Sequence, residues 1–196
     1  MLDLRKIIKG SIVSILLILP LFVASQTNYR IKSHEISIAG TSNIQSWTAE
    51  VEKVSGTFSI TIEDGKIAEL HDANLRVDAG SIIGSEGRMM NNKIYDALDI
   101  KNHPAITFTL REVLSLAENP GTARVSSRGV LTIAGVSRLI TLNTTGRVLP
   151  NGDLEFSGTQ KVNMSDHRVS PPTAMLGALR TGDEVTLNYK VVLQAN

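Results

Sequence analysis

The chain of 196 residues contains no cysteine, and this absence excludes several kinds of structure at once. No disulfide framework can support the fold, and no thiolate is available to ligate zinc. A lipid-modified N-terminal cysteine is excluded for the same reason. The fold must therefore be held together by its hydrophobic core.

Aromatic residues and catalytic or metal-binding motifs are also scarce. Phe, Tyr and Trp make up 4% of the chain, and there is one Trp. His34, His71, His103 and His167 are scattered without a ligand spacing such as HxH or HExxH, so we interpret each of them as a surface or turn residue and expect no metal site. Neither a Gly-x-Ser-x-Gly elbow nor a phosphate-binding loop is present. These absences argue against an enzyme.

The chain also lacks an excess of one charge. It has 20 basic and 19 acidic side chains, and without residues 1–25 the balance is 17 to 18. Such a balance gives no reason to expect nucleic acid or an anionic membrane surface as the main partner. The remaining residues 26–196 have the length of a single domain.

One long apolar run is present, and it lies at the N-terminus. It covers residues 11–24, follows a short basic stretch and precedes small residues before Gln26. The run falls short of the roughly 20 residues that span a bilayer, and Pro20 interrupts it. We therefore predict a cleaved signal peptide over residues 1–25 and an exported domain, periplasmic or secreted, over residues 26–196. The alternative is an uncleaved membrane anchor.

The rest of the chain alternates apolar and polar residues with the period of a β-strand. The alternation predicts strands over residues 29–39, 46–53, 54–63, 67–78, 106–114, 124–133, 137–148, 154–164 and 184–193. Asp64-Gly65, Ala134-Gly135 and Asn151-Gly152 mark tight turns between successive strands. We predict an all-β fold, an antiparallel barrel of about eight strands, because closure hides the edges of such a sheet. A two-sheet sandwich is the alternative.

The predicted inward faces contain small residues. Gly129, Gly146 and Gly158 fall on these faces, with Ser127 and Thr144 beside them. We interpret them as leaving the lumen underfilled, with room for one small ligand. The alternative is that the glycines serve only to let the barrel curve.

Two segments break the strand pattern. Residues 85–98 space apolar residues like a helix, and residues 171–180 begin with two prolines and carry apolar residues at helical spacing. We expect a short helix in each, and these two segments are the ones available to cover a barrel end.

Four stretches resemble the YceI-like family of exported lipid-binding proteins. They are IAGTSNIQSWTAEVEKVSGTF, NNKIYDALDIKNHPAITF, RGVLTIAGVSRLITL and PPTAMLGALRTGDEVTLNY, in the order in which the family has them. The resemblance extends from Tyr29 to Leu193. It implies a lipocalin-like, antiparallel eight-stranded barrel with a short helix covering one end. It also implies a long amphiphile in the lumen, such as a polyisoprenoid, a quinone-like tail or a fatty-acid derivative.

The resemblance carries no catalytic motif and no cofactor. It therefore implies a non-catalytic carrier or sequestering protein for a long-chain lipid. Some members form dimers and some are associated with membrane cytochromes, so a homodimer and an envelope or membrane redox partner are open expectations. Two other functions remain as alternatives: an interaction module with a plugged barrel, and a lipid- or quinone-modifying enzyme using Gln160 with Ser127.

Strand phase and the two non-strand segments supply the candidate binding residues. We predict that the lumen is lined by Trp47, Phe58, Leu75, Ile94, Phe108, Leu131, Leu142, Phe156, Met175, Leu176, Leu187 and Tyr189. A charged head group would stay at the mouth, where the basic residues of the non-strand segments are Arg88, Lys93, Arg168 and Arg180.

Overall fold

The computed structural model describes residues 26–196, and the signal peptide predicted over residues 1–25 lies outside them. The strands are β1 (Gln26–Ser42), β2 (Ser46–Val51), β3 (Val54–Glu63), β4 (Lys66–Asp78), β5 (Ile82–Gly84), β6 (Ala105–Asn119), β7 (Thr122–Ile133), β8 (Val136–Val148), β9 (Leu154–Asn163), β10 (Thr173–Ala174) and β11 (Leu179–Ala195). The helices are α1 (Arg88–Leu98) and the 3-10 turns η1 (Ala79–Ser81), η2 (Met164–His167) and η3 (Met175–Gly177).

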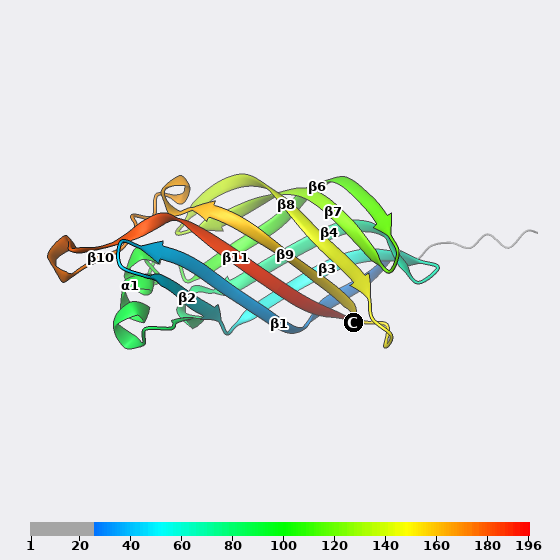
Figure 1. Ribbon diagram of the computed structural model, residues 1–196. Helices are drawn as coiled ribbons and strands as arrows, with labels where there is room; N and C mark the ends of the chain where they lie inside the picture. The colour runs from blue at the N-terminus through cyan, green and yellow to red at the C-terminus, as the bar shows by residue number, and fades with distance from the viewer. Residues whose placement is uncertain (1–25) are drawn as a thin grey trace, which may run out of the picture.

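Eight of the strands close into an antiparallel barrel (Figure 1). The order around the barrel is β1, β3, β4, β6, β7, β8, β9 and β11, and β11 pairs again with β1. Closure leaves these strands without a free edge along their paired lengths. The predicted barrel is confirmed, and the two-sheet sandwich is wrong.

The tight turns predicted from dipeptides join neighbouring barrel strands. Asp64 and Gly65, between β3 and β4, have φ values of 49° and 73°, and Ala134 and Gly135, between β7 and β8, have 47° and 75°. Two successive positive φ values twist a hairpin in the same sense as its strands. The turn at Asn151-Gly152 likewise joins β8 to β9, and these turns fix the register that brings apolar faces inward.

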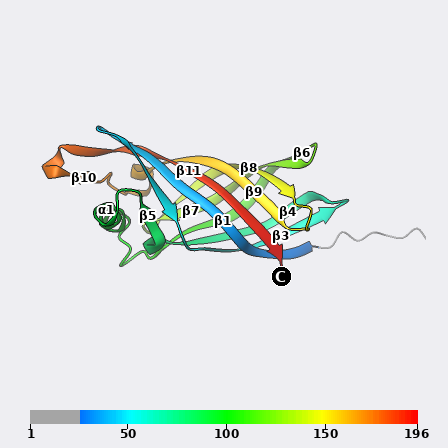
Figure 2. The ribbon, with the colours of Figure 1, turned by 60° about the horizontal axis from the view of Figure 1, so that its bottom comes forward.

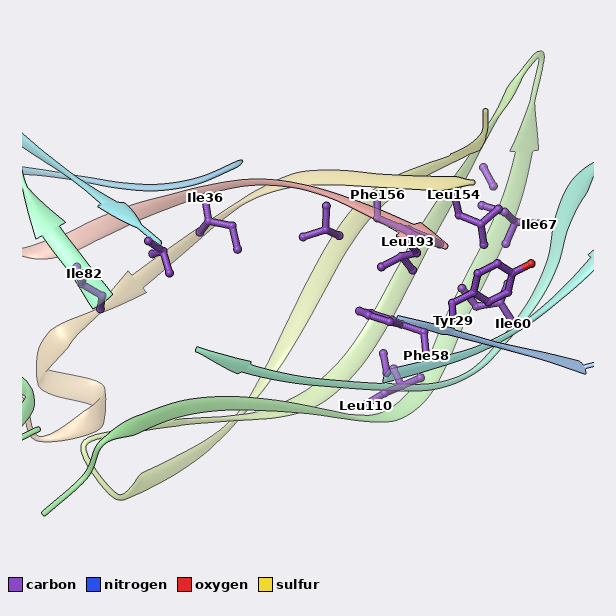
Figure 3. Close-up of a cluster of buried hydrophobic side chains, with 14 of the residues drawn as sticks. Tyr29, Ile36, Phe58, Ile60, Ile67, Ile82, Leu110, Leu154, Phe156 and Leu193 are labelled. Atoms are coloured by element: carbon purple, nitrogen blue, oxygen red, sulfur yellow. The ribbon is translucent and has the colours of Figure 1, made fainter. Parts of the chain in front are cut away.

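One end of the barrel is filled by apolar side chains, which we call the floor. Tyr29, Ile60, Ile67, Leu154 and Leu193 converge there and are buried (Figure 3). They come from β1, β3, β4, β9 and β11, at the end of the barrel where the C-terminus lies (Figure 1). Burying one large aliphatic side chain contributes about 1.5–3 kcal/mol, so the floor is a major part of the core.

The opposite end of the barrel is built differently. There β1 pairs with β2 instead of β3, β2 pairs with β5, and α1 follows, so that α1 lies at this end (Figures 1 and 2). The Oδ1 atom of Asn91 accepts a hydrogen bond of 2.7 Å from the backbone N–H of Gly84. Met90 packs against the same glycine, which has no side chain to keep it away. The helix predicted within residues 85–98 is confirmed.

The second expected helix, in residues 171–180, is wrong. Thr173 and Ala174 of β10 pair with Arg180 and Leu179 of β11, and η3 joins the two strands. Leu176 and Gly177 have φ values of 57° and 88°, which a right-handed helix cannot contain. The segment is a hairpin that extends β11 beyond the barrel (Figure 1).

Candidate functional site

A cavity of about 220 Å³ lies inside the barrel, on the side of the floor that faces α1; we call it the inner cavity. Its wall is made by side chains of alternating positions on the barrel strands, as the strand phase predicts. Eight of the residues predicted for the lumen line it: Phe58, Leu75, Phe108, Leu131, Leu142, Phe156, Leu187 and Tyr189.

The inward glycines do not leave empty space in the way we expected. A Cβ atom at Gly129 would overlap the ring of Phe108, one at Gly146 would lie 2.7 Å from the ring of Phe156, and one at Gly158 would lie 2.6 Å from Cζ of Tyr189. Each glycine is therefore covered by an aromatic ring of the neighbouring strand, so the predicted space is present in the lumen but does not lie at the glycines themselves. The rings pack over the glycines, and the same three aromatic residues line the inner cavity.

A second cavity of about 460 Å³ lies at the α1 end; we call it the mouth cavity. Trp47 and Ile94, both predicted for the lumen, line it. The indole N–H of Trp47 donates to the carbonyl oxygen of Thr41, and its ring covers Gly40 on the paired strand. The wall also contains the exposed residues Gln45 and Met89, so this cavity opens to solvent.

The two cavities adjoin at a ring of β-branched side chains, which we call the collar. Six residues line both cavities: Ile38, Ile82, Ile106, Ile133, Val162 and Val185. The lumen is thus a blind tunnel that is entered at the α1 end, passes the collar and is closed by the floor. The lumen prediction favoured aromatic and leucine positions and missed the collar, although its residues occupy inward strand positions.

Few polar groups interrupt the wall of the inner cavity. The hydroxyl groups of Tyr189 and Thr144 are hydrogen-bonded at 2.7 Å. Burial raises the pKa of the Tyr189 phenol, and the hydrogen bond from Thr144 acts in the opposite direction. Ser127 and Gln160 also line this cavity, but the Gln160 amide donates to the backbone carbonyl of Lys161.

The structure distributes the predicted head-group residues unevenly. Lys93 lines the mouth cavity, whereas Arg88, Arg168 and Arg180 are exposed and do not line it. The Nε atom of Arg180 donates to the carbonyl oxygen of Gly177 in its own hairpin. Lys93 is thus the one of the four that lines the mouth cavity, and a head-group role for the three arginines stays a prediction.

The predicted lumen residues of the second insert also need correction. Leu176 is fully exposed in the turn between β10 and β11 and lines neither cavity. Met175 lies in η3, and the structure does not describe its side chain.

One residue of the mouth cavity was interpreted differently from the sequence. His167 lies in η2, as expected of a turn residue, but its side chain is buried and lines the mouth cavity. A histidine in an irregular turn has no periodicity that would predict which way it points.

The family model of the YceI-like domain matches residues 29–193. The chain belongs to the YceI-like family. Solved structures agree with the YceI-like fold. The polyisoprenoid-binding domain from Saccharophagus degradans is 14% identical with a TM-score of 0.65, over 86% of this chain and 98% of that chain. BcnA of Burkholderia cenocepacia is 20% identical with a TM-score of 0.64, over 81% and 95%.

A third YceI-like structure, the YceI protein of Campylobacter jejuni, is 22% identical with a TM-score of 0.56, over 76% of this chain and 84% of that chain. No curated protein matches this YceI-like chain significantly. Within residues 26–196, no three His, Asp or Glu side chains gather as a metal site would require. Over the same residues no helix has the length and apolarity of a membrane span.

Proposed function

We propose that this YceI-like protein is an exported, non-catalytic carrier or sequestering protein for a long isoprenoid or a similar long-chain amphiphile. The apolar tail lies in the inner cavity, passes the collar and continues into the mouth cavity, where the polar end of the ligand stays. The observation that carries this proposal is the blind apolar tunnel with one entrance.

The physical basis is the burial of hydrocarbon. Each CH₂ group removed from water contributes about 0.8 kcal/mol, so several isoprene units suffice for micromolar affinity after the costs of association. The mouth cavity of about 460 Å³ falls within the range of about 300–1,000 Å³ usual for ligand sites. The lining residues of both cavities are mainly apolar, and apolar contacts do not demand one exact ligand shape.

Two related proposals concern catalytic activity and cellular location. A carrier needs no reacting groups, which agrees with Gln160 bonding to its own strand instead of to Ser127. Export rests on the signal peptide predicted over residues 1–25, so we place the protein in the periplasm or outside the cell. The homodimer and the envelope or membrane redox partner implied by the resemblance stay predictions.

Native mass spectrometry tests this function directly. The protein would be purified from its own cell envelope without detergent, and the bound material would be extracted into organic solvent. We expect an adduct of several hundred daltons with isoprenoid or acyl fragments. A mass without adduct, together with no uptake of added farnesol, geranylgeraniol or a quinone, would overturn the proposal and redirect attention to the plugged-barrel alternative.

A further inference from the structure

His167 is a buried polar group in the wall of an apolar cavity. It is 2% exposed and lines the mouth cavity at the end of η2. The other described polar residues of that wall are more accessible than His167. Gln45, Glu86, Lys93 and Thr173 are exposed, and Ser42 and Thr181 are half-buried. The His167 side chain would therefore contact a part of the ligand that is buried from solvent.

The hydrogen bonding of His167 fixes which ring nitrogen carries the proton. Its Nδ1 atom lies 2.9 Å from the backbone carbonyl oxygen of Val136. A carbonyl oxygen only accepts, so Nδ1 donates and, in the neutral ring, Nε2 is left as an acceptor. The side chain is thereby held in one orientation by β8.

The Nε2 atom has no partner among the described residues. His167 makes one hydrogen bond within them, through Nδ1, and no fully buried side-chain nitrogen or oxygen in this part of the chain lacks a partner. Nε2 is therefore not sealed inside the protein, and the ring that carries it lines the mouth cavity. An acceptor in a wall that is mostly apolar needs a donor, and water or the polar end of a bound molecule can supply it.

We propose that Nε2 of His167 accepts a hydrogen bond from a hydroxyl group at the polar end of the ligand. The site would then select long-chain alcohols or phenols, such as prenols and hydroquinones, over equally long molecules without an O–H donor. This inference rests on the proposed function, because it assigns the head group of the same ligand.

The test compares farnesol with its methyl ether, which has the same chain but no donor. Binding would be followed by the fluorescence of Trp47, the single Trp of the chain, which lines the same cavity. We expect the unmodified protein to prefer the alcohol by about tenfold, the worth of one hydrogen bond. The 15N resonance of Nε2 should shift with the alcohol and stay in place with the ether.

Two substitutions separate the acceptor from the structural bond. His167→Asn keeps a donor near Val136 without an acceptor at the Nε2 position, and His167→Phe removes both nitrogens. We expect both variants to bind alcohol and ether equally, at the affinity that the unmodified protein has for the ether. A preference that persists in both variants, or that is absent in the unmodified protein, would overturn this inference alone. Failure of the unmodified protein to bind either molecule would overturn the proposed function as well.

A second inference comes from exposed apolar side chains around the mouth. The described residues include five exposed large hydrophobic side chains, and three of them stand at this end: Ile44 at 63%, Met89 at 75% and Leu176 at 109% exposure. They belong to the β1–β2 turn, α1 and the β10–β11 turn, which lie at the same end of the molecule (Figures 1 and 2). We call these three residues the rim.

The segments that carry the rim are joined to one another and to the cavity. The side chain of Asn43 donates to the carbonyl oxygen of Ala178 at 2.9 Å and accepts from the backbone N–H of Arg180 at 2.8 Å. Met89 also lines the mouth cavity, so the apolar surface continues from the rim into the tunnel. Arg88 and Arg180, both exposed, and Lys93 of the cavity wall bring positive charge to this end, against one exposed carboxylate of the wall, Glu86.

We infer that the rim docks on the surface of a lipid bilayer. Apolar side chains flanked by basic ones are what the boundary between head groups and acyl chains accommodates. Contact at this place joins the tunnel entrance to the membrane interior, so that a lipid tail passes between them without crossing water. This inference depends on exposed residues and is independent of His167.

A vesicle flotation assay with a matched pair of variants tests the rim. Ile44→Ser/Leu176→Ser removes two rim side chains that line neither cavity, and Leu114→Ser/Leu139→Ser removes the other two exposed leucines, on the outer wall of the barrel. With phosphatidylcholine vesicles containing phosphatidylglycerol, we expect the first variant to lose about tenfold or more in partitioning, and the second to behave as the unmodified protein.

The remaining outcomes identify other occupants of the rim. Equal losses in the two variants, or no flotation of the unmodified protein, would overturn membrane docking. So would light scattering that shows a dimer in the unmodified protein and a monomer in Ile44→Ser/Leu176→Ser, since the rim would then contact a second copy. Binding of farnesol in solution should be unchanged in both variants, which keeps this test separate from the proposed function.

Discussion

Three aromatic rings of the inner cavity depend on a glycine of the neighbouring strand. Tyr189 lies directly opposite Gly158, Phe156 lies opposite Gly146, and the ring of Phe108 covers Gly129. Glycine supplies no Cβ, so each ring packs on the backbone instead of projecting across the lumen. The sequence showed which glycines face inward, but the identity of the covering ring depends on strand register, which the sequence did not determine.

Replacing Gly129 by Ala tests this arrangement. The new Cβ would overlap Phe108, so we expect the free energy of unfolding to fall by about 1–3 kcal/mol, with the ring displaced into the inner cavity. Chemical denaturation of Gly129→Ala, Phe108→Ala and the double variant measures it. The penalty should be smaller in the Phe108→Ala background, where the contact of the new Cβ with the backbone oxygen of Thr109 at 2.8 Å remains, and equal penalties in both backgrounds would show that the ring is not the cause.

The buried phenol of Tyr189 makes stability depend on alkaline pH. Burial raises its pKa in the folded protein, with Thr144 opposing, so the neutral form is favoured in the folded state. This contribution is fully present below the unfolded pKa of about 10 and is lost as pH rises through the folded pKa. We expect the free energy of unfolding to fall less between pH 8 and pH 10.5 in Tyr189→Phe than in the unmodified protein. Tyr29, whose pKa burial also raises, contributes in the same direction in both proteins.

At the scale of elements, alternation and turn dipeptides predicted most of the fold. In long strands with apolar residues at every second position, such as β7 and β11, the inward-facing residues were predicted correctly, because the side chains of a pleated strand point to only two faces. The hairpin at residues 171–180 was mistaken for a helix, since a short apolar spacing after two prolines fits both structures. The pairing of β10 with the extension of β11 selects the hairpin over the helix, and the apolar spacing of the sequence does not show this pairing.

The attachment of α1 is an element-scale feature with a matched control on the same helix. Asn91 accepts from the backbone of Gly84, whereas the neighbouring Asn92 is exposed. We expect Asn91→Ala to speed hydrogen exchange over residues 88–98 and to raise the dissociation rate of bound farnesol several-fold, because the helix at the entrance is released. Asn92→Ala should change neither rate. If the two variants behave alike, α1 does not control access.

At the scale of the whole molecule, the sequence predicted a lumen but not its division. Strand phase named eight residues that line the inner cavity. It did not indicate that the floor fills one end, because Ile60, Ile67 and Leu154 have the same alternation as the cavity wall and differ only in height along the barrel axis. Height depends on shear and on where each strand begins, which are properties of the closed barrel.

A substitution in the collar can test how far the ligand tail extends into the tunnel. Val162 lines both cavities, so Val162→Phe narrows the passage between them. In the unmodified protein we expect affinity to rise from geraniol through farnesol to geranylgeraniol, because each added unit buries more CH₂ groups. In Val162→Phe the rise should stop at the prenol whose tail reaches the collar, while the shorter prenols bind as before. Leu139→Phe, on the outer wall of β8, should retain the full rise. An undiminished rise in Val162→Phe would mean that the tail does not pass the collar, and the ligand would then lie in the mouth cavity alone.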